Sequence, residues 1–124
     1  MVRDDPAGIR DGETLRRLDS GLEIQRRLKH EPVDFSSWSP AELEEKTDER
    51  HGSKFLPEWS LQRVTNWTAQ AVADAGWTLR PGIKRSAIFQ FEAPVGIVRG
   101  RRSYKIKIVS DGRYVHAYPV GEDR

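Results

Sequence analysis

The sequence predicts an α+β fold, with N-terminal helices followed by a twisted antiparallel sheet that ends in a β-hairpin. Three observations support this fold class. Apolar residues recur at helical spacing before Gly76, the apolar pattern changes to period two after it, and the dipeptide DG lies between the last two alternating runs. Helices first and an antiparallel sheet afterwards are typical of an α+β domain.

The composition limits the size of this domain and the chemistry open to it. With 124 residues, 36% of them apolar and 32% charged, the chain is expected to form one domain with a modest core. We expect residues 1–12 to be a flexible leader and residues 13–124 to be the domain itself. No apolar stretch approaches a membrane span. Cysteine is absent, which excludes disulfides, thiol catalysis and cysteine zinc sites.

Three helices are expected in the first part of the chain. Leucines at near-helical spacing predict a helix over residues 13–29. The stretch SPAE, with Ser39 as N-cap and Glu42 completing a capping box, predicts a second helix that ends near Gly52. The clearest helix lies in PEWSLQRVTNWTAQAVADAG, which Ser60 can cap and the final glycine ends. Its apolar stripe is flanked by tryptophans that we expect in the core: Trp59, Trp67 and Trp77.

Four β-type runs follow this helix: SAIFQFE, VGIVRG, RSYKIKIV and RYVHAYPV. With the DG dipeptide as the two central residues of the last turn, Lys107 is predicted to pair with His116 and Lys105 with Tyr118. Because side chains alternate between the two faces of a strand, the hairpin would have one apolar and one polar face. The apolar face would hold Ile106, Ile108, Val115 and Ala117, and the polar face Lys105, Lys107, Val109, Tyr114, His116 and Tyr118.

The polar face of the hairpin carries side chains suited to acid–base chemistry at a phosphodiester. A neighbouring cation lowers the pKa of a histidine, and a histidine that titrates near neutrality can exchange protons. Lysines can stabilise the negative charge that develops on a phosphoryl group. RNA cleavage by transesterification needs only such parts. The alternative is the solvated face of a half-buried sheet, where lysine and tyrosine are ordinary, and the residues alone leave both open.

The two other histidines could take part in catalysis or could have only a structural role. His30, after the first expected helix, or His51, at the end of the second, could form an acid–base pair with His116, although both are also typical surface or capping residues. No HExxH, DxD or cysteine–histidine pattern occurs, so we expect no metal and no cofactor.

Basic residues dominate between positions 83 and 113, which favours either binding of a polyanion such as RNA or a solvated basic face without such a partner.

Residues 53–120 contain the stretches KFLPEWSLQRVTNWTAQAVADAGW, APVGIVRG and YKIKIVSDGRYVHAYPV. These stretches resemble the C-terminal toxin domains of bacterial polymorphic and contact-dependent inhibition systems, most closely the RNase A-like and endonuclease-U-like toxins. The resemblance implies that residues 13–124 are a single ribonuclease-like domain, a metal-independent endoribonuclease toxin cleaving RNA such as tRNA. It also implies a cognate immunity protein as partner and secretion or delivery into the cytoplasm of a target cell.

The resemblance also implies roles for individual residues. Tyr118 matches the family tyrosine, His116 occupies the place of a phosphate-contacting threonine or serine, and His30 best matches the upstream catalytic histidine. A basic residue of the following helix maps to Lys46 or Arg50. The catalytic candidates are His30, His116, Lys107, Tyr118 and His51, and the candidates for phosphate or RNA binding are Lys105, Lys46, Arg50, Arg101, Arg102 and Tyr114. The alternative function is a non-catalytic module of the same fold that binds nucleic acid or a protein.

Overall fold

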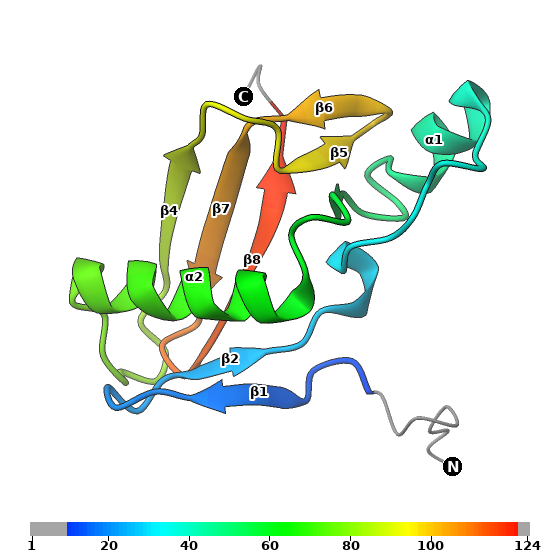
Figure 1. Cartoon of the computed structure of the whole chain (residues 1–124). Helices are drawn as coiled ribbons and strands as arrows, with labels where there is room; N and C mark the ends of the chain where they lie inside the picture. Colours follow the sequence, from blue (N-terminus) through cyan, green and yellow to red (C-terminus); the bar gives the residue numbers. More distant parts are fainter. Residues whose placement is uncertain (1–9, 122–124) are drawn as a thin grey trace, which may run out of the picture.

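The computed structural model describes residues 10–121, and within them it has two sheets and two α-helices (Figure 1). The main sheet has the strand order β1-β2-β8-β7-β4, and a smaller sheet has the order β3-β5-β6. Most of the leader expected at residues 1–12 lies outside the described residues. The elements are β1 (Thr14–Arg17), β2 (Glu23–Gln25), the 3₁₀ helix η1 (Leu28–His30), α1 (Pro40–Lys46), β3 (Lys54–Phe55), α2 (Leu61–Ala75), β4 (Arg85–Gln90), β5 (Gly96–Val98), β6 (Arg101–Ser103), β7 (Lys105–Ser110) and β8 (Tyr114–Val120).

Helix α2 forms as predicted and lies across one face of β4, β7 and β8 (Figure 1). The Ser60 side chain accepts a hydrogen bond from the Arg63 N–H at the start of the helix, and Gly76 ends the helix with a φ of +72°. The core lies between α2 and the inner face of the main sheet. Its buried residues are Leu22, Phe55, Trp59, Val64, Ala71, Val72, Val95, Ile106, Ile108, Val115 and Ala117, with Trp67 and Trp77 partly buried against them.

The helix predicted over residues 13–29 is wrong, because this segment forms β1, a turn, β2 and η1. Leu22 and Ile24 are almost fully buried and alternate with half-buried neighbours, which is the period of a strand. Gly21 has a φ of +95°, a conformation that no helix contains. Strand β2 pairs with β8 in parallel, so the main sheet is mixed and not purely antiparallel as predicted. The α+β class holds, but strands and not a helix come first.

Helix α1 begins as predicted and ends earlier. Ser39 and Glu42 form the predicted capping box, but the helix ends at Lys46 and does not continue to Gly52. The reason lies at Thr47, which caps the C-terminus and whose buried hydroxyl donates to the Leu43 carbonyl. No residue of α1 is buried, so no apolar stripe extends the helix beyond that point.

The hairpin of β7 and β8 has the predicted faces and a different register. Its turn is centred on Gly112 and Arg113, because the Asp111 carboxylate accepts the N–H groups of Arg113 and Tyr114 and Gly112 takes a φ of +95°. The register is therefore two residues away from the predicted one. A shift of two keeps every side chain on its face, and the predicted apolar face is buried. The observed pairs include Val109 with His116, Lys107 with Tyr118 and Lys105 with Val120.

The stretch RSYKIKIV, predicted as one strand, is divided between the two sheets. Its first residues belong to β6 and the rest to β7, with Tyr104 between them. The Ser103 hydroxyl occupies this corner, where it donates to the carbonyls of Lys105 and Val120. The small sheet is thereby held beside the C-terminal end of β8, as Figure 1 shows.

Candidate functional site

An open cleft of about 470 Å³ lies at the outer face of β8, the face opposite α2. Its floor is formed by β8, and its walls are η1 with the residue before it, the segment after α1, and the turn between β5 and β6. The lining residues are Arg27, Lys29, His30, Thr47, Asp48, Glu49, Gly52, Ser53, Val98, Arg99, His116, Tyr118, Val120 and Gly121.

Three rings form a stack along one side of this cleft. The ring centroids of His30 and Tyr118 are 4.8 Å apart with an angle of 18° between the planes, and those of His116 and Tyr118 are 5.7 Å apart with an angle of 25°. His116 and Tyr118 are neighbours on the outer face of β8, whereas His30 comes from η1. The fold therefore brings two imidazoles into contact with one phenol.

Hydrogen bonds fix the orientation of the His30 ring. Its Nδ1 lies 2.8 Å from the carbonyl oxygen of Ser53, and the Ser53 hydroxyl donates to the Pro119 carbonyl at 2.7 Å. Because a carbonyl oxygen only accepts, Nδ1 carries the proton in the neutral ring and Nε2 has the free lone pair. Gly52 lies against the ring, since a Cβ there would be 3.3 Å from His30 Cε1.

Both histidines of the cleft are neutral near pH 7. Burial lowers the pKa of His30 to about 4, the hydrogen bond to Ser53 opposes this change, and the charge of Lys29 adds to it. Burial also lowers the pKa of His116 to about 4, with a further contribution from the nearby cations Arg27 and Lys29. An uncharged imidazole can accept a proton, so the resting cleft holds two potential bases.

The cations of the cleft are Arg27, Lys29 and Arg99, none of which the sequence analysis proposed as a site residue. Arg27 and Lys29 could have been found, because they precede His30 in the basic run RRLKH. Arg99 gave no such signal, because its position depends on the turn between β5 and β6. Two carboxylates, Asp48 and Glu49, also line the cleft.

Of the catalytic candidates, His30, His116 and Tyr118 line the cleft, and His51 and Lys107 do not. Lys107 lies on the outer face of β7 and pairs with Tyr118. The predicted pairing of Lys107 with His116 is wrong, because the turn is centred one residue later than expected. His51 is exposed after α1, with its Nδ1 3.0 Å from the Asp48 carboxylate.

The candidates for phosphate or RNA binding all lie outside the cleft lining. The Lys46 ammonium lies 4.7 Å above the Trp38 ring, and Arg50 is exposed beyond α1. Tyr114 lies near the hairpin turn, where the Arg113 guanidinium is 5.3 Å from its ring. The remaining three lie on neighbouring strands: Lys105 on β7 opposite Val120, and Arg101 and Arg102 exposed on β6.

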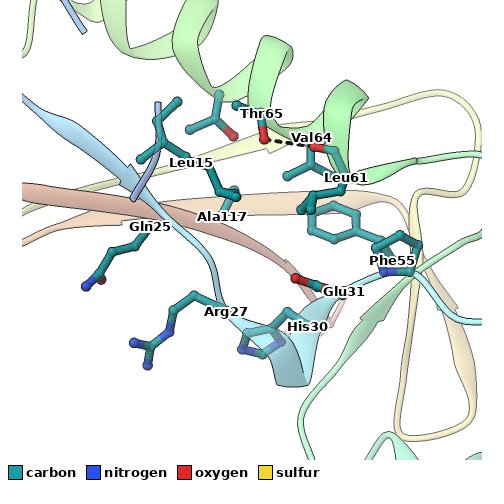
Figure 2. A pocket seen from close by; sticks show the side chains of 13 residues that line it. Leu15, Gln25, Arg27, His30, Glu31, Phe55, Leu61, Val64, Thr65 and Ala117 are labelled. Atoms are coloured by element: carbon teal, nitrogen blue, oxygen red, sulfur yellow. Dashed lines mark hydrogen bonds between the residues drawn. The ribbon is translucent and has the colours of Figure 1, made fainter. Parts of the chain in front are cut away.

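A second, much smaller cavity of about 20 Å³ lies inside the core between α2 and β2 (Figure 2). Figure 2 shows Leu61, Val64 and Thr65 of α2 on one side of it, with the Thr65 hydroxyl donating to the Leu61 carbonyl. Arg27 and His30 line both this cavity and the open cleft. The volume is about that of one water molecule, which is too small for a substrate.

Within residues 10–121, no group of three or more His, Cys, Asp or Glu side chains is placed to hold a metal ion. In the same part of the chain, no helix has the length and apolar character needed to cross a membrane. Comparisons with protein-family models, with curated proteins and with solved structures find no match. The function must therefore be inferred from the chemistry of the cleft.

Proposed function

We propose that this protein is an endoribonuclease that cleaves RNA by attack of the ribose 2′-hydroxyl on the adjacent phosphodiester. The observation that carries the proposal is the stack of His30, Tyr118 and His116 in one cleft. This reaction needs a base on one side of the phosphorus, an acid on the other and a donor between them. Two imidazoles that both contact one phenol provide these groups.

His30 is suited to act as the base. Its Nδ1 proton is donated to the Ser53 carbonyl, so Nε2 can accept the proton of the 2′-hydroxyl. The lowered pKa keeps the ring unprotonated at neutral pH. The 2′-oxygen then forms a bond to phosphorus, the bond from phosphorus to the 5′-oxygen breaks, and a 2′,3′-cyclic phosphate remains.

His116 is suited to act as the acid once RNA is bound. In the empty cleft, burial and the cations Arg27 and Lys29 lower its pKa. A bound phosphodiester brings a negative charge that offsets those cations, and this charge raises the pKa of His116. The protonated ring then donates its proton to the leaving 5′-oxygen, which departs as a hydroxyl. The Tyr118 hydroxyl donates to a non-bridging oxygen between the two histidines.

The basic side chains around the cleft are suited to hold the RNA backbone. Arg27 and Lys29 line the cleft, while Lys107 and Lys105 continue the outer face of the sheet beyond Tyr118. Contacts of this kind act through phosphate charge and do not depend on base sequence. The toxin role, delivery into a target cell and neutralisation by an immunity protein belong to the same proposal and are supported by the resemblance.

The test is cleavage of total RNA by the purified protein in the presence of EDTA. We expect products with 2′,3′-cyclic phosphate and 5′-hydroxyl ends. His116→Ala should lower the cleavage rate by about 10²–10⁴-fold. Tyr118→Phe should lower it by a smaller factor. His51→Ala is the matched control, because this exposed histidine lies outside the cleft lining.

Two results would contradict the proposal. One is RNA that stays intact while it binds in a salt-sensitive manner, which would favour the non-catalytic binding module instead. The other is cleavage that survives in the His116 variant and is lost in the His51 variant. Growth arrest on cytosolic expression, relieved by His116→Ala, would support the toxin role separately from the cleavage assay.

A further inference from the structure

The turn between β5 and β6 has a conformation that does not suit the residue that occupies it. Val98 pairs with Arg101, so Arg99 and Gly100 are the two central residues of a tight hairpin. Their φ angles are +51° and +79°, the pattern of a type I′ turn. Such turns favour Asn-Gly, because side chains other than asparagine and aspartate are strained at positive φ. Arg99 is the one non-glycine residue with positive φ among the described residues.

The strained turn is fixed in place by Thr47. The Arg99 N–H donates to the Thr47 carbonyl and the Gly100 N–H donates to the Thr47 hydroxyl, both at 2.8 Å. Thr47 is 1% exposed, and its hydroxyl donates in turn to the Leu43 carbonyl of α1. These hydrogen bonds provide acceptors for both backbone N–H groups of the turn. By fixing the turn, they also determine the direction in which the Arg99 side chain points away from the backbone.

The Arg99 side chain lines the cleft that contains His116 and Tyr118. Its ion-pair partner is Glu49, with 3.8 Å between the guanidinium Nη1 and the carboxylate Oε2. The Glu49 side chain is 90% exposed, and an exposed pair at this distance is weak. The guanidinium can therefore exchange this carboxylate for another anion without a buried charge being left unpaired.

We propose that Arg99 is the residue that binds a phosphoryl group in the cleft, with Thr47 as its positioning residue. A guanidinium matches two phosphoryl oxygens through parallel N–H donors, a geometry that asparagine at the same turn position cannot provide. The strain at Arg99 is retained because the cation is needed at this place. The consequence for catalysis rests on the proposed ribonuclease function, but the binding of phosphate does not.

The experiment compares phosphate binding to Arg99→Asn and to a matched control, Arg80→Asn. Arg80 is exposed near the hairpin turn of β7 and β8, at the opposite end of β8 from Tyr118. Inorganic phosphate is titrated into each protein while the ring signals of His30 and His116 are followed by NMR. We expect saturable shifts in the wild type and in Arg80→Asn, and an affinity about 10- to 100-fold weaker in Arg99→Asn.

Thermal unfolding separates this effect from a folding defect. Because asparagine suits the first central position of the turn, Arg99→Asn should unfold at the same or a higher temperature than the wild type. Thr47→Val, which removes the acceptor for the Gly100 N–H, should weaken phosphate binding, and Thr47→Ser should restore it. Arg99→Lys should bind with intermediate affinity, because it keeps the charge and loses the paired donors.

The proposal is overturned if Arg99→Asn binds phosphate as tightly as Arg80→Asn. RNA cleavage by the same variants distinguishes this failure from that of the proposed function. If the wild type cleaves RNA and Arg99→Asn cleaves it equally well, only the role of Arg99 is contradicted. A wild type that binds phosphate through Arg99 and leaves RNA intact contradicts the ribonuclease and supports the phosphate site.

Discussion

The imidazole of His30 and the phenol of Tyr118 stack with centroids 4.8 Å apart, although they come from opposite ends of the described chain. The contact joins η1 to β8 three residues beyond Val115, the last residue of β8 that pairs with β2. Ser53, which directly precedes β3, accepts the Nδ1 proton of His30 at its carbonyl and donates its hydroxyl to the Pro119 carbonyl, so it adds a second, indirect link between η1 and β8. The site is therefore held by the fold itself and not by a loop closing over it.

Replacing His30 by asparagine should remove activity and preserve the fold. The asparagine amide can donate to the Ser53 carbonyl as Nδ1 does, but it has no group that can take up a proton. We expect RNA cleavage to fall by about 10²–10⁴-fold. The measurement is the initial rate on a fluorescent oligoribonucleotide, together with the midpoint of thermal unfolding.

The control for this prediction is His51→Asn. His51 is exposed and does not line the cleft, although its partner Asp48 does, so its replacement should leave the rate unchanged. If His30→Asn cleaves at the wild-type rate while it remains folded, His30 is not the base.

Gly52→Ala should lower the rate of RNA cleavage by more than the loss of stability from its backbone strain can explain. Gly52 has a φ of +89°, and a Cβ there would lie 3.1 Å from Lys29 and 3.3 Å from His30 Cε1. The Lys29 side chain can move, but the His30 ring is held by Ser53 and stacks on Tyr118. A base displaced by about 1 Å costs about 10²-fold in rate, so a displacement of the ring by a few tenths of an ångström should cost a smaller factor. The measurement is the cleavage rate beside the free energy of unfolding in urea.

Gly82→Ala is the matched comparison. Gly82 has almost the same φ, +88°, and a Cβ there would meet no atom within 4 Å. Both variants should lose about 1–2 kcal/mol of stability from the left-handed conformation, but only Gly52→Ala should lose activity. Equal activity in the two variants would show that the position of His30 does not matter.

Stability should fall as the pH decreases from 6.5 to 4. His30 and His116 each have a pKa of about 4 in the folded protein against 6.5 as the ordinary value. Between these values the unfolded chain binds protons that the folded protein does not bind, so protonation favours unfolding. His30 accounts for on the order of 3 kcal/mol, since one pKa unit corresponds to about 1.4 kcal/mol. His116 is more open to solvent and contributes less.

Urea unfolding at pH 7 and pH 5 measures this dependence. The carboxyl groups with lowered pKa, such as Asp48 and Asp111, have ordinary values of 3.8 and lose their contribution only below this window. His30→Asn should therefore reduce the difference in stability between the two pH values. A wild-type protein equally stable at both pH values would contradict the lowered pKa of both histidines.

After residue 60 the sequence allowed the helix and the strand-forming segments to be predicted, because local signals there agree with one another, but not the hairpin register or the division of RSYKIKIV between two sheets. Ser60 and Gly76 mark the ends of α2, and the period-two runs mark the strands. The first part was predicted wrongly, because its leucines fit both a helix and a strand. The choice between helix and strand depends on the pairing of β2 with β8, and no local sequence pattern reports that contact.

The site could be predicted where it depends on strand alternation and not where it depends on distant contacts. His116 and Tyr118 share a face because they are two residues apart on β8, and an error of two in the register did not change this. His30 was one of two upstream histidines that could pair with His116, and the family resemblance favoured it over His51. Arg99 was missed because its role depends on a turn held by Thr47, more than fifty residues earlier in the sequence.

Gly112→Ala should be the most destabilising of the glycine replacements, because the turn that sets the hairpin register has no room for a side chain. A Cβ at Gly112 would overlap the backbone carbonyl of Arg80, which in turn donates its N–H to the Gly112 carbonyl. The backbone cannot relax as a flexible side chain can, so the loss should exceed the roughly 1–2 kcal/mol expected from positive φ alone. Urea unfolding of Gly112→Ala beside Gly82→Ala measures the difference. A loss no larger than that of Gly82→Ala would mean that the turn is not packed against Arg80, and the observed pairing of Val109 with His116 would lose its structural cause.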